Sequence, residues 1–295
     1  MELLRFSVIV PVAREGESLY DRISLFASEL GHLAVRHGFF YEILCVSDVY
    51  DRPTVWAMMR LAKRGLSKAL FLTARVGKGG SIKNAMPYSM GDYIVLLDAD
   101  MPVSAEVVYR AVLLTVRSSL DVLVPTRARR GHGVLRQLLS VAYNSVVNLL
   151  FRTGYRDHQA GFKVLSRRAA LVILVGMTRT DGFAYDTEII VWAKKHGLRH
   201  GTVNIAWNEN REESTIAPLR ALLTMLADLL VLRLLTLAGK HVALRRYGVG
   251  RVINLGNVHA VGREFTTAIN VSGWKRFVVG VFRKLYVAVA LYKRG

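Results

Sequence analysis

The sequence predicts an α/β fold with a mostly parallel, mixed sheet flanked by helices. Three features of the 295-residue chain predict it: short β-branched apolar runs alternate with helix-period segments, acidic residues follow two of these runs, and 52% of the residues are hydrophobic. Strands that alternate with helices favour parallel pairing through right-handed crossovers. In sheets of this kind, ligands bind at the carboxyl ends of the strands.

The first half of the chain supplies four expected strands and the helices between them. The expected strands are residues 6–11, 42–46, 69–73 and 92–97, and the expected helices are residues 17–37, 54–64 and 81–89. Asp48 follows the second strand, and Asp98 and Asp100 follow the fourth. We therefore expect these three carboxylates at one edge of the sheet.

The second half changes character and suggests three parts to the chain. Beyond the strands and helices expected up to residue 216, a helical pattern covers residues 218–246, and the final segment is rich in lysine and arginine. We predict a catalytic domain at 1–216, amphipathic membrane-interface helices at 217–246 and a basic extension at 247–295. The interface helices would lie with their leucine-rich face in the acyl region of a bilayer.

Charge indicates a polyanionic partner. Lysine and arginine number 41 against 22 acidic residues, which gives a formal charge of +19. Together with a mean hydropathy of +0.27, this favours an anionic membrane surface over nucleic acid. The single cysteine, Cys45, excludes an intrachain disulfide framework, and the histidines lack zinc-site spacing.

Membrane attachment is expected to be peripheral. There is no signal-peptide pattern at the N-terminus, and a membrane span needs about 18 apolar residues with few charges. The strongest candidate, residues 219–239, is interrupted by Arg220, Asp228 and Arg233. We therefore predict a protein at the cytoplasmic face of a membrane that does not cross it.

The strongest chemical signal is Asp98-Ala-Asp100 after an apolar strand. Two carboxylates on one turn can share a hard divalent cation that keeps positions open for phosphate oxygens. Such a metal stabilises the charge on a departing diphosphate. Taken alone, the same residues could equally cap the next helix.

Other motifs accompany this pair along the chain. In order, they are VIVP at 8–11, GKGG at 77–80, GDYIVLLDAD at 91–100, DHQAGFK at 157–163, GFAYDTE at 182–188 and WNENREES at 207–214. In this order they resemble family 2 glycosyltransferases. Within that family, residues 6–235 are most similar to polyprenyl-phosphate glycosyltransferases, the dolichyl-phosphate mannose and glucose synthases.

The resemblance implies a Rossmann-like GT-A fold and an inverting transfer of a hexose from GDP-mannose or UDP-glucose to a polyprenyl or dolichyl phosphate. It implies Mg²⁺ or Mn²⁺ bound by Asp98 and Asp100, and a role in protein glycosylation. The implied donor-binding residues are Pro11, Ala13, Glu15, Asp48, Lys78, Asp98 and Gln159. The implied acceptor-binding residues are Arg127, Phe162, Lys163, Trp207, Arg211 and Ser214. The implied catalytic residues are Asp98, Asp100, Arg127, Asp157 and Arg211.

The proposed chemistry needs little help from a base. A phosphate monoester has a second pKa of about 6 and is already anionic near neutral pH. The site must instead neutralise two phosphate groups, for which arginine is well suited. One departure from the mannose synthases is Pro102, which stands where they commonly place a metal-binding glutamine.

Several alternatives remain open at this stage. The acceptor could be a hydroxyl of a lipid-linked glycan or polysaccharide, with Asp157 as the base. The basic C-terminal helices could pack on the catalytic domain or form a homodimer interface. The chain could also be a basic nucleic-acid-binding module, although no motif that reads RNA or DNA is present, or a relative that has lost activity and acts as a scaffold.

Overall fold

The structure is a computed structural model that describes residues 3–127, 134–176, 184–205, 218–237, 253–255 and 258–261. The strands are β1 (Arg5–Val12), β2 (Phe40–Ser47), β3 (Lys68–Leu72), β4 (Tyr93–Leu96), β5 (Val122–Arg127), β6 (Lys163–Ser166), β7 (His200–Ile205), β8 (Ile253–Leu255) and β9 (Val258–Val261). The helices are α1 (Ser18–His37), α2 (Arg52–Lys63), α3 (Gly77–Ala85), α4 (Ala105–Arg117), α5 (Val134–Phe151), α6 (Arg167–Gly176), α7 (Tyr185–Lys195) and α8 (Pro218–Leu237), with a 3-10 turn η1 (Met86–Tyr88).

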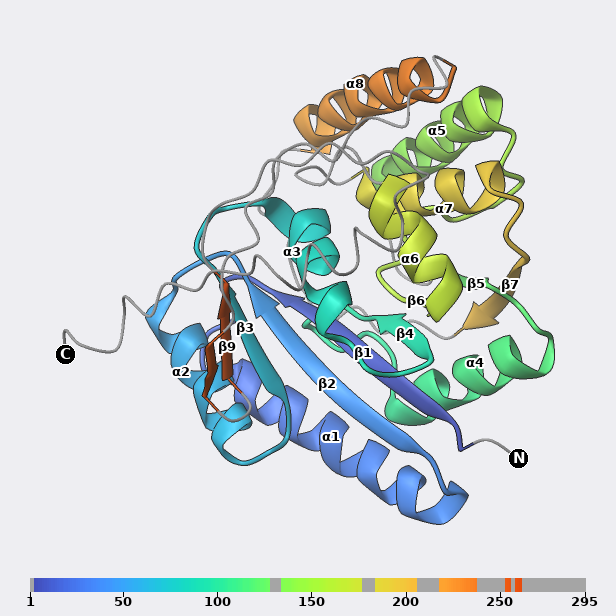
Figure 1. Cartoon of the computed structure of the whole chain (residues 1–295). Helices are drawn as coiled ribbons and strands as arrows, with labels where there is room; N and C mark the ends of the chain where they lie inside the picture. Colours follow the sequence, from blue (N-terminus) through green and yellow to red (C-terminus); the bar gives the residue numbers. More distant parts are fainter. Residues whose placement is uncertain are drawn as a thin grey trace.

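The strands in the described part of the chain form one nine-stranded sheet, in the order β7-β5-β6-β4-β1-β2-β3-β9-β8 (Figure 1). The central strands β4, β1, β2 and β3 are parallel. The short strand β6 is antiparallel to both β4 and β5. The predicted fold class, a mostly parallel mixed sheet flanked by helices, is confirmed.

Helices cover both faces of the sheet because the central strands are apolar on both sides. Val8 and Val10 of β1 pack with residues of α1, α2 and α4. Ile9, between them, points to the opposite face and belongs to the cluster that includes residues of α3, α6 and α7. Figure 1 shows the same arrangement, with α1, α2 and α4 on one side and α3 and α6 on the other.

The fold brings the predicted site residues to one edge. Because β1, β2, β3 and β4 are parallel, the segments that follow them meet at the carboxyl edge of the sheet. The strand β5 has the same direction, since β6 is antiparallel to both β4 and β5. The loop that leads into β6 therefore reaches this edge as well.

Two findings concern the C-terminal part of the chain. The strand β9 pairs parallel with β3, so residues that we assigned to a basic extension add to the catalytic sheet. The helix α8 falls within the predicted interface segment, of which residues 238–246 lie outside the described residues. Among the residues that the structure describes, no helix is both long enough and apolar enough to cross a bilayer.

Candidate active site

The Asp98-Ala-Asp100 segment forms a tight turn at the end of β4. The amide N–H of Met101 donates to the carbonyl oxygen of Asp98 at 3.0 Å. Met101 has a φ of 50°, a left-handed conformation that a side chain other than glycine seldom adopts. Strained backbone of this kind often marks functional sites. Here it follows directly after the two aspartates.

Asp98 lies directly against Gly161. The antiparallel register pairs Leu96 of β4 with Lys163 of β6. Two residues beyond Leu96 and two residues before Lys163, the chain places Asp98 opposite Gly161. A Cβ on Gly161 would lie 2.2 Å from Oδ2 of Asp98, so any other residue at this position would require the carboxylate to move.

Lys78 provides the nearest positive charge to Asp98. Its Nζ lies 2.6 Å from Oδ1 of Asp98, and the two side chains are 33% and 27% exposed, respectively. Burial alone would lower the pKa of Lys78, but the carboxylates of Asp98 and Asp186 outweigh this effect and hold the pKa above its ordinary value. Lys78 is therefore a cation at neutral pH.

Lys78 is positioned by an early start of α3. We expected this helix at residues 81–89, but it begins at Gly77, in the glycine-rich run that reads as a loop. Oδ2 of Asp48 explains the difference, because it accepts hydrogen bonds from the N–H groups of Val76 at 2.8 Å and Gly77 at 2.6 Å. A carboxylate from the end of β2 thus caps this helix from a distance.

A buried ion pair lies beneath Lys78. Lys163 is fully buried, and its ammonium group donates to the carboxylate of Asp186 and, at 2.6 Å, to the carbonyl oxygen of Ala160. Burial raises the pKa of Asp186, although Lys163 and Lys78 both oppose the shift. The ring of Tyr185 lies 5.4 Å below the Lys78 ammonium.

Asp157 and Arg127 form a bidentate pair. Nε of Arg127 donates to Oδ2 of Asp157 at 2.6 Å, and Nη2 donates to Oδ1 at 2.9 Å. Burial alone would raise the pKa of Asp157, but the hydrogen bonds and charge of Arg127 outweigh it and hold the pKa below its ordinary value. Asp157 is therefore a carboxylate at neutral pH and a weak base.

A second arginine connects the end of β1 to the Asp98 turn. Arg22 of α1 donates to the Glu15 carboxylate at 2.9 Å and to the carbonyl oxygen of Ala99 at 3.1 Å. Pro11 lies in β1, and the exposed Ala13 follows it at the carboxyl edge. Arg22 thus links one predicted donor residue, Glu15, to the turn with Asp98.

The remaining predicted residues fall into three groups. Gln159 contacts α8, where its Nε2 lies 3.6 Å from Sδ of Met225. Phe162 and Lys163 are fully buried, so their predicted contact with the acceptor stays a prediction. Trp207, Arg211 and Ser214 lie outside the described residues.

The structure gives specific contacts to three residues that were not among the predicted catalytic, donor-binding or acceptor-binding residues. Asp186, Gly161 and Arg22 each contact or position a predicted residue. Asp186 and Gly161 belong to the motifs GFAYDTE and DHQAGFK, and this membership is the sequence feature that could have indicated their roles. Arg22 carried no signal, because its role depends on how α1 packs beside the turn.

The donor set fits a hard divalent cation. Asp98 and Asp100 offer carboxylate oxygens, the ligands that Mg²⁺ and Mn²⁺ favour. Within the described ranges, no group of three or more histidine, cysteine, aspartate or glutamate residues could hold a metal. An ion at this turn would then share the two aspartates with phosphate oxygens and water.

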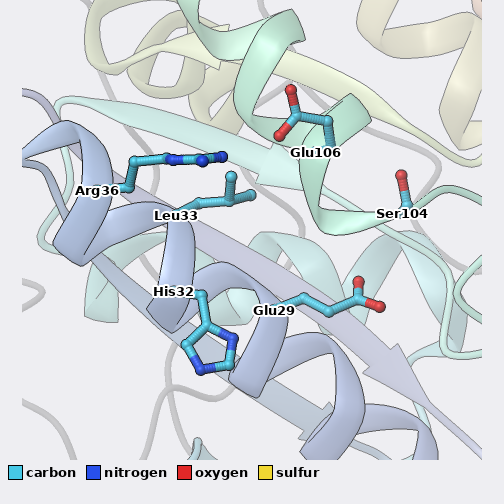
Figure 2. A pocket seen from close by; sticks show the side chains of 6 residues that line it. All are labelled: Glu29, His32, Leu33, Arg36, Ser104 and Glu106. Carbon is cyan, nitrogen blue, oxygen red and sulfur yellow. The ribbon is translucent and has the colours of Figure 1, made fainter.

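A separate cavity contains none of the predicted residues. It has a volume of about 420 Å³ and lies between α1 and the start of α4. Figure 2 shows its six lining side chains: Glu29, His32, Leu33, Arg36, Ser104 and Glu106. Acidic and basic groups are mixed along its wall.

The chain is similar in sequence to known glycosyltransferases. Residues 7–171 match the family model described as "Glycosyl transferase family 2". The chain is 26% identical over 231 residues to the glycosyltransferase AglD of Haloferax volcanii, covering 76% of this chain but only 36% of that protein. It is 28% identical over 254 residues to the human dolichyl-phosphate beta-glucosyltransferase, covering 80% of this chain and 76% of the human protein.

A solved structure confirms the GT-A fold. Glucosyl-3-phosphoglycerate synthase from Mycobacterium tuberculosis, crystallised with Mn²⁺, uridine diphosphate and glucosyl-3-phosphoglycerate, matches with a TM-score of 0.59. The match covers 91% of this chain and 88% of that chain at 16% identity. At this identity the likeness is one of fold.

Proposed function

Since the chain belongs to glycosyl transferase family 2, we propose that it transfers a hexose from a nucleotide sugar to a polyprenyl or dolichyl phosphate at a membrane surface. The observation that carries this proposal is the group of charged side chains at the carboxyl edge of the sheet. There the Asp98–Asp100 turn, Lys78 and the Asp157–Arg127 pair come from separate segments. Relatives named dolichyl-phosphate beta-glucosyltransferases favour glucose as the sugar.

The donor side would use both the acidic and the basic side chains of the site. Asp98 and Asp100 would hold Mg²⁺ or Mn²⁺, which supplies neutralisation of the donor diphosphate. Lys78, which lies against Asp98, would add a second positive charge near the same phosphates. Glu15 and Asp48, which follow β1 and β2, would border the nucleoside.

The acceptor side would depend on Arg127. Asp157 binds one edge of the guanidinium through Nε and Nη2, which fixes its direction. A positioned arginine suits a phosphate acceptor, because a guanidinium matches phosphate geometry. A hydroxyl acceptor would instead require a base, and the lowered pKa of Asp157 makes it a poor one.

Membrane contact would use the paired helices α5 and α8. They pack through Tyr143 and Val147 against Met225 and Leu229. Three leucines on α8, namely Leu230, Leu234 and Leu237, are more than half exposed at helical spacing, and α5 exposes Leu138, Val141 and Leu149 in the same way. We propose that these six exposed apolar residues contact the membrane, and we call them together the α5/α8 surface.

The direct test is a transfer assay with dolichyl phosphate in detergent, Mn²⁺ and labelled UDP-glucose or GDP-mannose. We expect label in the organic phase from one donor, abolished by EDTA and by Asp100→Ala. Donor hydrolysis without lipid-extractable label would move the proposal to another acceptor. The absence of both transfer and nucleotide binding would overturn it.

Membrane binding has its own test. Leu230→Ser combined with Leu234→Ser should reduce sedimentation with anionic liposomes. The matched control is Leu25→Ser with Val35→Ser, because these residues are exposed on α1 and apart from the α5/α8 surface. Equal sedimentation of both variants would contradict a specific role of this surface.

A further inference from the structure

His158 lies at the centre of a buried polar network between α5 and the loop before β6. It is fully buried, and Oδ1 of Asn144 lies 2.6 Å from its Nδ1 and 3.1 Å from its backbone N. Oγ1 of Thr153 lies 2.6 Å from its Nε2. Both ring nitrogens therefore contact side chains, one from α5 and one from the turn that follows it.

The neighbouring hydrogen bonds determine which groups donate. Nδ2 of Asn144 donates to the carbonyl oxygen of Ser140 at 2.8 Å, so the oxygen of this amide must face His158. That oxygen already accepts from the backbone N–H of His158 and can only accept from the ring. Nδ1 must therefore carry a proton.

The other ring nitrogen faces a hydroxyl that has a second acceptor. Burial is the main cause that lowers the pKa of His158 to about 4, and the charge of Lys163 adds to it, while Asp157 opposes it. The ring is thus neutral at pH 7, with its proton on Nδ1. Nε2 then competes with Oδ1 of Asn148, which lies 2.7 Å from the Thr153 hydroxyl oxygen, for the single proton of that hydroxyl. Neutral histidine with a defined tautomer can hold a loop without adding charge to the site.

His158 lies in the chain between two predicted site residues, Asp157 and Gln159. The preceding residue, Asp157, binds Arg127, and the following residue, Gln159, contacts Met225 of α8. A shift of the His158 ring would move both neighbours, because the three residues are consecutive. The ring therefore connects α5 with the guanidinium that faces the site.

We infer that His158 is a positioning residue that, through Asn144 and Thr153, fixes Asp157 so that Arg127 is held in one orientation. The effect on transfer rests on the proposed function, in which Arg127 binds the acceptor phosphate. The effect of His158 on the orientation of Arg127 does not rest on the proposed function. It acts through Asp157 and requires no contact between His158 and a substrate.

The first experiment reads the protein directly by ¹⁵N NMR of the full chain. We expect the wild-type imidazole to show a protonated Nδ1 and an unprotonated Nε2 from pH 8 to 5. In His158→Gln, the Nε–H of Arg127 should exchange with solvent about tenfold faster, the size expected for losing one hydrogen bond. An Nε2–H tautomer in the wild type would overturn the assignment.

A matched control separates positioning from stability. Tyr143→Phe removes a buried hydrogen bond of 2.8 Å from the neighbouring residue of α5 to Thr187 of α7. It should lower stability without changing the exchange of the Arg127 Nε–H. Equal exchange in both variants would overturn the inference. Thr153→Val, which is nearly isosteric, serves as the second test if His158→Gln does not fold.

Kinetics supply the second readout. In His158→Gln, KM for dolichyl phosphate should rise about tenfold, while KM for the nucleotide sugar changes less than about twofold, since only the acceptor-side arginine is displaced. An equal rise in both constants would overturn the role on the acceptor side. If Arg127 exchange changes as expected but no lipid phosphate is glycosylated, the positioning role stands and the proposed function fails.

Discussion

Asp98 and Gly161 occupy facing positions beyond the ends of two antiparallel strands, and the missing Cβ of Gly161 is the space that the Asp98 carboxylate fills. The two residues belong to motifs about sixty positions apart in the chain. Their contact makes the DHQAGFK segment one wall of the acidic turn. The aspartate of one motif and the glycine of the other therefore meet a single steric requirement, which is room for the Asp98 carboxylate.

Replacement of Gly161 by alanine should displace Asp98. The new Cβ would lie 2.2 Å from Oδ2, a distance at which one group must move. We expect transfer activity to fall at least 100-fold, about 2.7 kcal/mol in transition-state free energy, in a protein that remains folded. Activity assays with circular dichroism check this prediction.

The control for this prediction is Gly31→Ala in α1. A Cβ at Gly31 would meet only the Tyr41 hydroxyl oxygen, at 3.3 Å. Alanine is also the better helix former, so activity should be retained. Comparable losses in both alanine variants would contradict the specific role of Gly161.

Removal of Lys78 should strengthen metal binding by the protein alone. In Lys78→Met, Asp98 loses the ammonium group at 2.6 Å and its negative charge becomes available to an added cation. We expect Mn²⁺, measured by electron paramagnetic resonance without donor, to bind roughly tenfold more tightly, as the loss of a partly exposed charge contact allows.

Lys68→Met offers a matched control for this measurement. Lys68 forms a 2.6 Å pair with Glu42 at the opposite edge of the sheet. Its removal should leave Mn²⁺ affinity unchanged. Weaker Mn²⁺ binding by Lys78→Met would show that Lys78 helps to shape the turn and does not compete with the metal.

Truncation of Lys163 should be strongly destabilising. In Lys163→Met, the carboxylate of Asp186 stays buried without its hydrogen-bonded cation. Breaking a buried pair on one side typically costs about 3–5 kcal/mol in unfolding free energy. Urea unfolding measures this cost. A loss below about 1 kcal/mol would mean that water or Lys78 replaces the missing partner.

Stability should decrease in mild acid because of His158. Its folded pKa of about 4 lies below the ordinary value of 6.5, so the unfolded state binds the proton first as the pH falls. The contribution of His158 to the free energy of unfolding is fully present above pH 6.5 and is lost as the pH falls toward 4. About 2 kcal/mol of it is lost between pH 8 and 5. Two charged groups face the ring, Lys163 and Asp157.

The measurement compares urea unfolding of wild type and His158→Gln at both pH values. Other titrating groups contribute equally to both proteins, so the difference isolates the imidazole. The wild type should lose more stability than the variant. Parallel losses would indicate that the ring titrates near its ordinary pKa in the folded protein.

The sequence predicted what depends on local pattern. Apolar runs and helical periodicity located the central strands within about two residues, and Asp98 and Asp100 were expected at the strand end where they lie. Pattern failed where a distant residue decides the outcome. The run GKGG reads as a loop, yet it begins α3 because Asp48 caps it.

The interior of the site was less predictable. No periodicity shows that Lys163 is buried on Asp186, or that the ring of His158 faces Asn144. Such contacts depend on the register between strands and on how helices pack. Motif membership indicated that these residues matter, but not which of them contact one another.

The pairing of β9 with β3 also affects solubility and folding. Without residues 258–261, β3 would end the sheet as an exposed edge strand with unpaired N–H and C=O groups along Lys68–Leu72. Such an edge readily recruits a strand from another molecule. A chain cut before this point would therefore tend to self-associate through β3, although every predicted donor residue is still present.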